Sequence, residues 1–343
     1  MVDKNFWKNK KVLITGHSGF KGAWLSIILN TLGSEVYGLS NNSNTSKIYD
    51  LHPKNYLKKE FLLDITDLSS DLEEVFKNNK FDYVFHLAAQ AFVSLAKENP
   101  RDTLIANIIG TYNILDLINK HETTKNLIIS TTDKVYLDPS KENNEEDFLG
   151  GFEFYGISKA SAEMVIKAFS MNISNFNIRV VRSGNVLGPG DYGKDRLITD
   201  ILNSVKEERP IIIRNPNSIR PWQDIMDSLS GYILVAENIK NGIEYDVFNL
   251  NAEINSDFKV KDLVEILLEK WNSKSEIIYK KNEELIETEI LRLNSNKAKK
   301  KLGWSDKIEM NKIIEKIIDW EKSIPNIEKV TNLQILEYFE LKG

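Results

Sequence analysis

Tyr155 and Lys159 form the pair of side chains whose types and spacing most directly suggest catalysis. They lie four residues apart in segment 154–171, whose apolar spacing predicts a helix, so both face the same side of it. A phenol beside an ammonium group loses its proton more readily, which makes Tyr155 a candidate base toward a sugar or alcohol hydroxyl. The alternative is a surface pair. Tyr338 and Lys342 have the same spacing, and we interpret them as a solvated tail.

A second group of polar residues follows the predicted strand 126–130. Thr131 and Thr132 are succeeded by Asp133 and Lys134, at the end of a strand where α/β sheets bind ligands. A carboxyl and an ammonium group side by side can remove one proton and supply another in a single reaction. Taken alone, this segment is better explained as a simple turn with a surface ion pair.

A glycine-rich loop, GHSGFKG at 16–22, joins the predicted strand 11–16 to the helix-like segment 23–32. Glycines without Cβ let the backbone turn tightly against a pyrophosphate, whose charge the free N–H groups of the helix start favour. The spacing differs from the usual G-x-G-x-x-G, and an ordinary glycine-containing turn is the alternative. We favour nucleotide binding because of the elements that surround the loop.

The form of the dinucleotide is left open by the second strand. It ends in Leu39-Ser40-Asn41, without the carboxylate that would favour NAD. No arginine or lysine follows directly that could bind the 2′-phosphate of NADP. Asp64, after the third strand, is a candidate for the adenine edge or a plain turn residue before a helix.

These residues need a scaffold, and the hydrophobic pattern predicts one. Short apolar runs alternate with helical periodicity through residue 182, which indicates parallel strands joined by crossover helices. We therefore expect an α/β fold with a doubly wound parallel sheet of Rossmann type and a smaller C-terminal α/β substrate lobe. The nucleotide-binding domain is predicted over 1–184, with returning segments at about 224–250. The lobe is predicted over 185–223 and 251–343.

Composition narrows the class of protein further. The net charge of −5 argues against nucleic-acid binding, and the absence of cysteine excludes disulfides and thiolate chemistry. No apolar run is long enough for a membrane span, no leader is recognised, and a cytoplasmic protein is expected. The four histidines lack metal-ligand spacing, so no metal is expected, and His86 is interpreted as structural.

Several motifs together resemble the extended short-chain dehydrogenase/reductase family. They are GHSGFKG (16–22), HLAAQ (86–90), NIIGTYNIL (107–115), YGISK (155–159) and RSGNVLGPGD (182–191). Within that family the chain is most similar to the sugar-nucleotide 4,6-dehydratases, and among these to the ones that act on CDP-glucose. FKG (20–22), TTDK (131–134), KDRLITDIL (194–202) and IIIRNPNSIRPWQDI (211–225) carry this narrower resemblance.

The resemblance implies a tightly held NAD and assigns residues to it. These are Gly16, His17, Gly19, Phe20, Lys21 and Gly22 in the loop, Asp64 and Ile65 at the adenine, and Leu87, Ala88, Ala89, Thr131, Tyr155 and Lys159.

It also implies a reaction. Tyr155 would take the C4 hydroxyl proton, with Lys159 lowering its pKa and Thr132 bonding the sugar. Asp133 would protonate the departing 6-hydroxyl, and Lys134, where most relatives have a glutamate, would be the base at C5. The product would be a 4-keto-6-deoxy sugar, with no net redox change.

For the nucleotide-sugar substrate, the resemblance points to Asn185, Arg196, Leu197 and Arg220, the arginines suiting its diphosphate. It further implies a homodimer or higher homo-oligomer that pairs through two long helices. The candidate seam is Ile105, Ile108, Ile109, Tyr112, Ile166 and Phe169, whose alternative is the domain core.

Three other functions stay open. A sugar-nucleotide epimerase needs Tyr155 and Lys159 but not the Asp133–Lys134 pair. Another 4,6-dehydratase would act on a dTDP-, GDP- or UDP-hexose. A non-catalytic NAD-sensing regulator on the same fold is more remote, because such a protein has no need of Tyr155.

Overall fold

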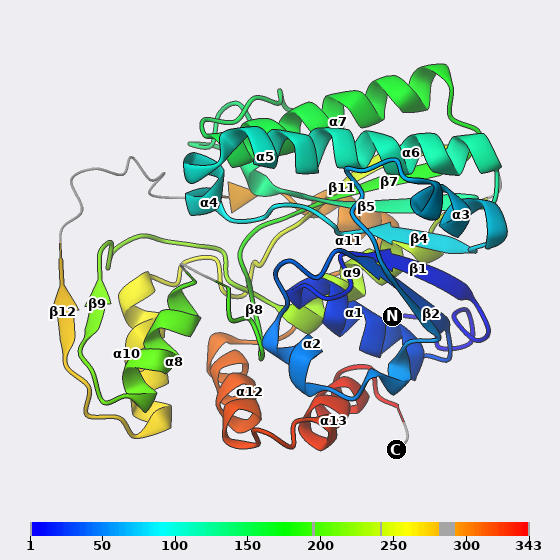
Figure 1. Cartoon of the computed structure of the whole chain (residues 1–343). Helices are drawn as coiled ribbons and strands as arrows, with labels where there is room; N and C mark the ends of the chain where they lie inside the picture. The colour runs from blue at the N-terminus through cyan, green and yellow to red at the C-terminus, as the bar shows by residue number, and fades with distance from the viewer. Residues whose placement is uncertain (1, 194–195, 241, 281–291, 342–343) are drawn as a thin grey trace.

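The computed structural model describes residues 2–193, 196–240, 242–280 and 292–341. Its centre is a seven-stranded sheet in the order β11-β7-β5-β4-β1-β2-β3 (Figure 1). All neighbouring pairs are parallel. The strands are β1 (Lys11–Thr15), β2 (Glu35–Ser40), β3 (Lys59–Leu62), β4 (Tyr83–His86), β5 (Asn126–Thr132), β7 (Asn177–Ser183) and β11 (Tyr245–Leu250). The chain proceeds outward from β1 in both directions, so β1 and β4 flank the switch point where such sheets bind ligands.

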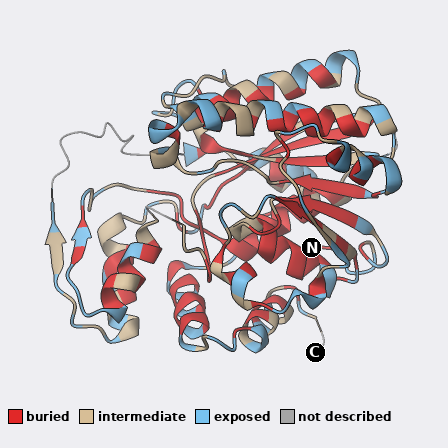
Figure 2. Cartoon of the chain, viewed as in Figure 1, coloured by how far each residue is buried: buried red, intermediate tan, exposed pale blue. Residues whose placement is uncertain are grey.

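Helices cover both faces of this sheet, which confirms the predicted doubly wound α/β fold. One face packs on α1 (Phe20–Thr31) and α9 (Ile225–Glu237). The other packs on α3 (Ser70–Asn78), α6 (Gly110–His121) and α7 (Phe154–Asn172). Figure 2 shows the buried residues concentrated in the strands and on the inner helix faces. Burial on both sides explains why the central strands β1 and β4 carry continuous apolar runs rather than an alternating pattern.

The predicted helical segment 101–121 is one continuous stretch with a change of pitch. α5 (Pro100–Leu104) passes into a π-helical turn, Ile105–Ile109, and then into α6. In the π-helical turn, Asn107 binds Ser158 of α7 through its Nδ2 at 2.8 Å. It also exchanges hydrogen bonds with the backbone of Gln90. Such turns occur often at functional sites, and this one connects the loop after β4 to α7.

A third hydrophobic core lies beside the sheet. It is formed by α8 (Leu197–Lys206), α10 (Val260–Trp271), α12 (Met310–Lys322) and the paired strands β9 (Ile211–Ile213) and β12 (Ile277–Tyr279). Figure 1 shows these elements grouped below and to the left of the sheet. A buried ion pair joins them to the larger core, because Lys316 of α12 contacts Asp224, the N-cap of α9, at 2.8 Å.

Further elements connect these layers. They are α2 (Lys47–Leu51), the 3₁₀ turns Lys54–Tyr56 and Asp133–Val135, β6 (Glu142–Asn143), α4 (Val93–Glu98), β8 (Val186–Leu187), β10 (Gln223–Asp224), β13 (Arg292–Leu293), α11 (Asn296–Leu302) and α13 (Glu328–Tyr338). Among the described residues, no helix combines the length and apolar character needed to cross a bilayer.

Two expectations about surface residues are corrected. Tyr338 is not part of a solvated tail, because its hydroxyl donates to Asp227 at 2.8 Å and its ring packs on the core around α1 and α9. Its proposed partner Lys342 lies outside the described residues. Ile166 and Phe169 are buried in this chain's own core rather than left free for a seam, since α7 turns them toward the sheet.

Candidate active site

The glycine loop is packed so tightly that two of its glycines have no room for a side chain. A Cβ on Gly22 would lie 2.1 Å from the carbonyl oxygen of Gly16, and one on Gly16 would lie 2.6 Å from the backbone nitrogen of Ala88. Gly16 also has a positive φ of 73°, which favours glycine. A Cβ on Gly19, in contrast, would meet only the Gly16 oxygen at 3.4 Å. Gly19 therefore faces open space, where a ligand can approach the backbone.

The helix that follows this loop begins without a cap. Gly19 is the N-cap of α1, no side chain accepts from its first N–H groups, and its first turn carries no acidic residue. An uncapped helix start after a glycine cradle suits a pyrophosphate. The site thus has the features that NAD requires, and Gly16, Gly19 and Gly22 are the residues that would hold its phosphates.

The other predicted loop residues turn their side chains elsewhere. His17 is buried against Gly38 of β2, and its Nε2 lies 2.6 Å from Oε1 of Glu60 on β3. The Lys21 ammonium donates to Ser183 at the end of β7 at 2.6 Å. Phe20 packs against the main core. The contact between His17 and Gly38 was missed, although a glycine inside a strand signals such a close approach.

The adenosine end of the candidate site is lined by hydroxyl and amide groups. Ser18 of the loop bonds Ser40 at the end of β2 at 2.7 Å. Asn41 donates to Asp64 at 2.8 Å, and Thr66 donates to the same carboxylate through its N–H and its hydroxyl. These hydrogen bonds lower the pKa of Asp64 against the opposing effect of burial. Asp64 is therefore held in its ionised form, close to the end of β2, which has no carboxylate of its own.

His86 lies at the end of β4, where it pairs with Thr15 of β1. Its ring bonds the hydroxyls of Thr15 at 2.7 Å and Thr111 at 3.1 Å, and burial lowers its pKa to about 3. A neutral, fully bonded imidazole confirms the structural interpretation. The part-buried residues Leu87, Ala88 and Ala89 follow directly, and the Ala88 N–H donates to Thr15. Ile65 is buried in the second core, and its carbonyl accepts from Asn113.

Tyr155 and Lys159 lie on the first two turns of α7, whose start is capped by the side chain of Glu153. The Lys159 ammonium donates to the carbonyl of Ser130 on β5 at 2.9 Å. Burial lowers the pKa of Lys159 to about 8, with Glu163 opposing and Lys21 reinforcing the shift. Burial raises the pKa of Tyr155, whereas a hydrogen bond with Thr132 and the charge of Arg196 lower it. Burial therefore outweighs the positive charges around this phenol.

Thr132 and Asp133 stand beside this phenol at the end of β5. The Thr132 hydroxyl donates to Oδ1 of Asp133 at 2.8 Å. Both residues are buried, and Oδ2 of Asp133 has no hydrogen-bond partner among the described residues. The same oxygen lies 3.2 Å from the position of a Cβ on Gly184, so a larger residue there would crowd it. The structure thus brings three of the predicted catalytic residues together, the buried Thr132 and Asp133 and the part-buried Tyr155.

Lys134 follows Asp133 in the chain but is less buried than Thr132 and Asp133. Its side chain is part-buried and makes no hydrogen bond or ion pair with the described protein. Its backbone carbonyl packs on Gly156, where a Cβ would lie 2.7 Å away. That contact ties the β5 segment to the first turn of α7.

A buried network beneath these residues was not predicted. Glu163, one turn after Lys159, accepts from the hydroxyl of Thr131 at 2.6 Å and pairs with Arg182 of β7 at 2.5 Å. Arg182 in turn donates to the hydroxyl of Tyr136 at 2.8 Å. The proton of the Thr131 hydroxyl is therefore already donated to Glu163. The i, i+4, i+8 spacing of Tyr155, Lys159 and Glu163 is the sequence signal that could have found it.

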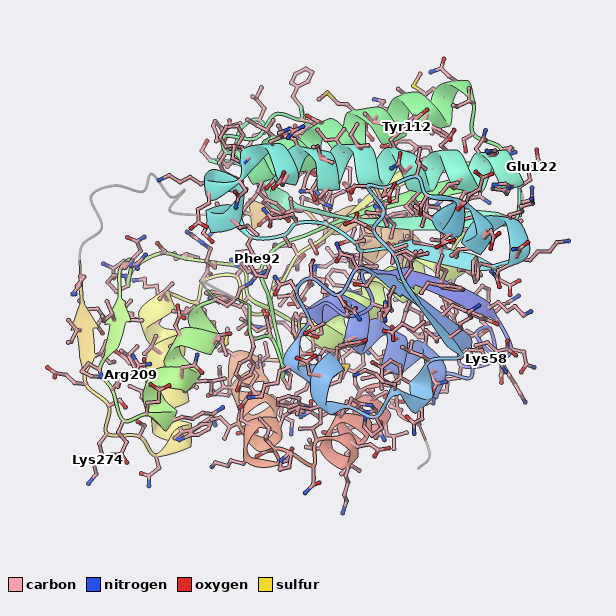
Figure 3. The ribbon with its side chains drawn as sticks, viewed as in Figure 1. Lys58, Phe92, Tyr112, Glu122, Arg209 and Lys274 are labelled. Carbon is pink, nitrogen blue, oxygen red and sulfur yellow. The ribbon has the colours of Figure 1, made fainter. Side chains whose placement is uncertain are left out.

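Of the predicted substrate residues, Arg196 lies near enough to Tyr155 for its charge to lower the pKa of that phenol. Arg196, the N-cap of α8, lies 3.8 Å from Asp191 through its Nε, and its guanidinium covers the ring of Phe92. Figure 3 shows Phe92 between the sheet and the group that contains α8. Arg220 is nine-tenths buried and donates to the carbonyl of Ile219.

The remaining two substrate candidates sit in the connections. Asn185 lies after β7, where its carbonyl accepts from Gln223, and Leu197 begins α8 and packs on the third core. No group of three or more metal-ligating side chains is present in the described ranges.

Comparison with known proteins agrees with this geometry. The model of the NAD dependent epimerase/dehydratase family matches residues 12–250, and the chain belongs to this family. It is thus an enzyme of the extended short-chain dehydrogenase/reductase type. It is 34% identical to the CDP-glucose 4,6-dehydratase of Salmonella typhimurium over 94% of this chain and 93% of the relative.

Epimerases are also similar. The UDP-glucuronate 4-epimerase of Thermodesulfobacterium geofontis is 28% identical over 94% of this chain and 99% of the relative. A crystal structure of UDP-glucose 4-epimerase from Thermotoga maritima has a TM-score of 0.81 at 25% identity, and it covers 91% of this chain and 99% of that one.

Proposed function

We propose that this enzyme is a sugar-nucleotide 4,6-dehydratase whose substrate is CDP-glucose and whose cofactor is NAD. The observation that carries the proposal is the cluster of Tyr155 with Thr132 and Asp133, in which a buried carboxyl oxygen has no hydrogen-bond partner among the described residues. An epimerase needs a base at the C4 hydroxyl but no acid for a leaving hydroxyl. The similarity to the Salmonella CDP-glucose 4,6-dehydratase supports CDP-glucose.

In this reaction NAD, when bound, would accept hydride from C4 of the hexose and return it to C6. Tyr155 removes the proton of the C4 hydroxyl, helped by the ammonium of Lys159 one turn away. Asp133 donates a proton to the 6-hydroxyl, which leaves as water. Lys134 takes the C5 proton, because its amine has no partner among the described residues and adjoins Asp133. A 4-keto group makes that C5 proton acidic, so oxidation precedes elimination.

The substrate would lie between the sheet and the third core. Arg196 and Arg220 suit its diphosphate through their planar guanidinium groups, and Asn185 and Leu197 border the same space. We take the sheet domain, 1–184 with 224–250, as the NAD-binding part and the rest as the substrate lobe. Two copies would pair through α5–α6 and α7, whose outer faces carry exposed Ile109 and Tyr112.

The test is to incubate the enzyme and NAD with CDP-, dTDP-, GDP- and UDP-glucose and to detect the base-labile chromophore of a 4-keto-6-deoxy product. CDP-glucose should give this product, and Asp133→Asn should oxidise C4 but release water at least about 100-fold more slowly. A product with inverted C4 and an intact 6-hydroxyl would establish the epimerase instead. A dehydrated product from another nucleotide alone would retain the reaction and replace the substrate.

A further inference from the structure

Tyr192, in the loop that follows β8, lies at the centre of a polar cluster that the proposed reaction does not use. Its hydroxyl donates to Oε2 of Glu321 at 2.6 Å and accepts from the Lys206 ammonium at 2.7 Å. Lys206 also forms an ion pair with the same carboxylate oxygen, and the Glu321 side chain is fully buried. The ammonium of Lys47 lies 4.0 Å from the centroid of the Tyr192 ring. The cluster therefore joins the loop to α2, α8 and α12.

The first half of this loop, residues 188–193, is held by hydrogen bonds to its backbone. The indole N–H of Trp24 in α1 donates to the Pro189 carbonyl at 2.9 Å, and the N–H of Lys47 donates to the Gly190 carbonyl at 3.2 Å. Gly190 has a positive φ of 80°, and a Cβ there would lie 2.8 Å from a side chain of α2. This half of the loop is therefore packed tightly against α1 and α2.

The second half of the loop holds α8 at two points. Thr199, in the first turn of α8, donates from its hydroxyl to the Asp191 carbonyl at 2.6 Å. Lys206, the last residue of α8, donates to the Tyr192 hydroxyl. The two contacts are about 10 Å apart along the helix axis, so together they fix the direction of the helix. Arg196 is the N-cap of this helix, and its place depends on that direction.

The guanidinium of Arg196 also meets the loop directly. Its Nε lies 3.8 Å from Oδ2 of Asp191, which is a charge–charge contact rather than a hydrogen bond. This Nε has no hydrogen-bond partner among the described residues. Its N–H is therefore available to an incoming phosphate oxygen.

We propose that Glu321 is a positioning residue for the substrate diphosphate, acting through Tyr192 and α8 on Arg196. The proposal rests on the proposed function, in which Arg196 binds that diphosphate. Glu321 supplies the negative charge that holds the ammonium groups of Lys206 and Lys47 at the same ring. Without that charge the two cations repel each other, and the end of α8 is released from the loop. Arg196 then loses the fixed direction that a planar arginine–phosphate pair needs.

The test compares the binding of CDP and of cytidine by the NAD-loaded enzyme, because the ratio of the two affinities reports on the diphosphate. Wild type should bind CDP more tightly than cytidine. Glu321→Gln and the more conservative Tyr192→Phe should each weaken CDP binding about tenfold and leave cytidine binding within about twofold. Calorimetric titration measures both dissociation constants.

Glu315→Gln is the matched control, because Glu315 lies on the same helix and pairs with Lys270 of α10 at 2.9 Å rather than with the loop. It should leave both affinities unchanged. In turnover, Glu321→Gln should raise KM for CDP-glucose about tenfold and keep kcat within about threefold of wild type.

A double-mutant cycle shows whether the effect passes through Arg196. Once Arg196→Met has removed the guanidinium, Tyr192→Phe should weaken CDP binding by less than about twofold further. If Tyr192→Phe keeps its full effect in that background, the cluster acts by another route and the proposal is wrong.

Other results would also overturn the positioning role. Equal losses of CDP and cytidine binding would show that the cluster only supports the fold, and unchanged CDP binding in both variants would show that it does not reach Arg196. A wild type that binds CDP no more tightly than cytidine would exclude the diphosphate site. The proposed function fails separately, if wild type prefers CDP to cytidine but forms no 4-keto-6-deoxy product from CDP-glucose.

Discussion

At Lys159, burial and neighbouring charge act in opposite directions on one ammonium group. The residue is 6% exposed, and burial lowers its pKa to about 8 from 10.5. Glu163 opposes the shift, and Lys21 adds to it. His86 also lies near this ammonium, and the imidazole is kept neutral by its own burial. The protein thus keeps an ammonium group one helical turn from the phenol that we propose as the base, at a cost in folding free energy.

This cost predicts how stability depends on pH. Between pH 8 and 10.5 the unfolded chain binds more protons at Lys159 than the folded chain, so the contribution of Lys159 to the free energy of unfolding rises with pH in this window. Relative to Lys159→Met, wild type should gain about 3 kcal/mol in the free energy of unfolding across it. Urea denaturation of matched cofactor-free samples at several pH values measures the difference.

Lys167→Met is the control for this measurement, because Lys167 is exposed on the same helix. Its stability should run parallel to that of wild type over the window. If the difference in the free energy of unfolding between wild type and Lys159→Met does not change with pH, Lys159 is not desolvated in the folded chain.

The glycine loop and α1 act as one element, in which two glycines have different tasks. Gly22 allows the helix start to pack on the backbone of Gly16, with 2.1 Å between an added Cβ and the Gly16 oxygen. Gly19 is not needed for that packing, because its added Cβ has only one neighbour, at 3.4 Å. We infer that the missing side chain of Gly19 leaves room for a ligand next to the backbone.

Alanine substitutions should separate these tasks. Gly19→Ala should keep the melting temperature of cofactor-free protein within a few degrees while weakening NAD binding by about tenfold or more, about 1.4 kcal/mol. Gly22→Ala should lower the melting temperature, because two backbone segments must move apart. Thermal melts and calorimetric titration with NAD provide both readouts. Unchanged NAD affinity in Gly19→Ala would place the pyrophosphate elsewhere.

On the scale of the whole molecule, apolar side chains remain exposed on the outer surface of α5–α6 and α7. Ile109 is 47% exposed and Tyr112 42%, and Ile157, Met164 and Met171 recur every seven residues along α7. Tyr112 is labelled on this outermost layer in Figure 3. An apolar surface of this kind on two adjacent helices is typical of a protein–protein interface.

We expect a light-scattering mass of twice 39.4 kDa for the wild-type chain, since a closed twofold pair buries the same surface on both copies. The double substitution Ile109→Lys with Tyr112→Lys should give the monomer mass. Ile212→Lys, at an equally exposed position on β9, is the control and should leave the mass unchanged. A wild-type chain that is already monomeric would exclude this interface.

Local sequence rules were sufficient to predict the parallel sheet and the order of its strands and helices along the chain. They also predicted the glycine loop and the shared helix face of Tyr155 and Lys159. Apolar strands alternating with helical segments require a parallel sheet. The spacing of Tyr155 and Lys159 predicts a shared helix face, and the glycines at 16 and 22 fit the close approach of backbone in the loop. Each is a property of residues near in the chain, which the physics of helices and strands links directly.

Contacts between distant segments were decided only by the tertiary structure. Glu163 meets Arg182 because α7 packs along β7, and His17 points to Glu60 because β3 joins the edge of β2. Tyr338, near the end of the chain, donates a hydrogen bond to Asp227 because α13 packs against the core around α9. The approach of Tyr155 to Thr132 arises in the same way, since it needs β5 and α7 side by side. Side-chain directions of this kind depend on packing, which no local spacing contains.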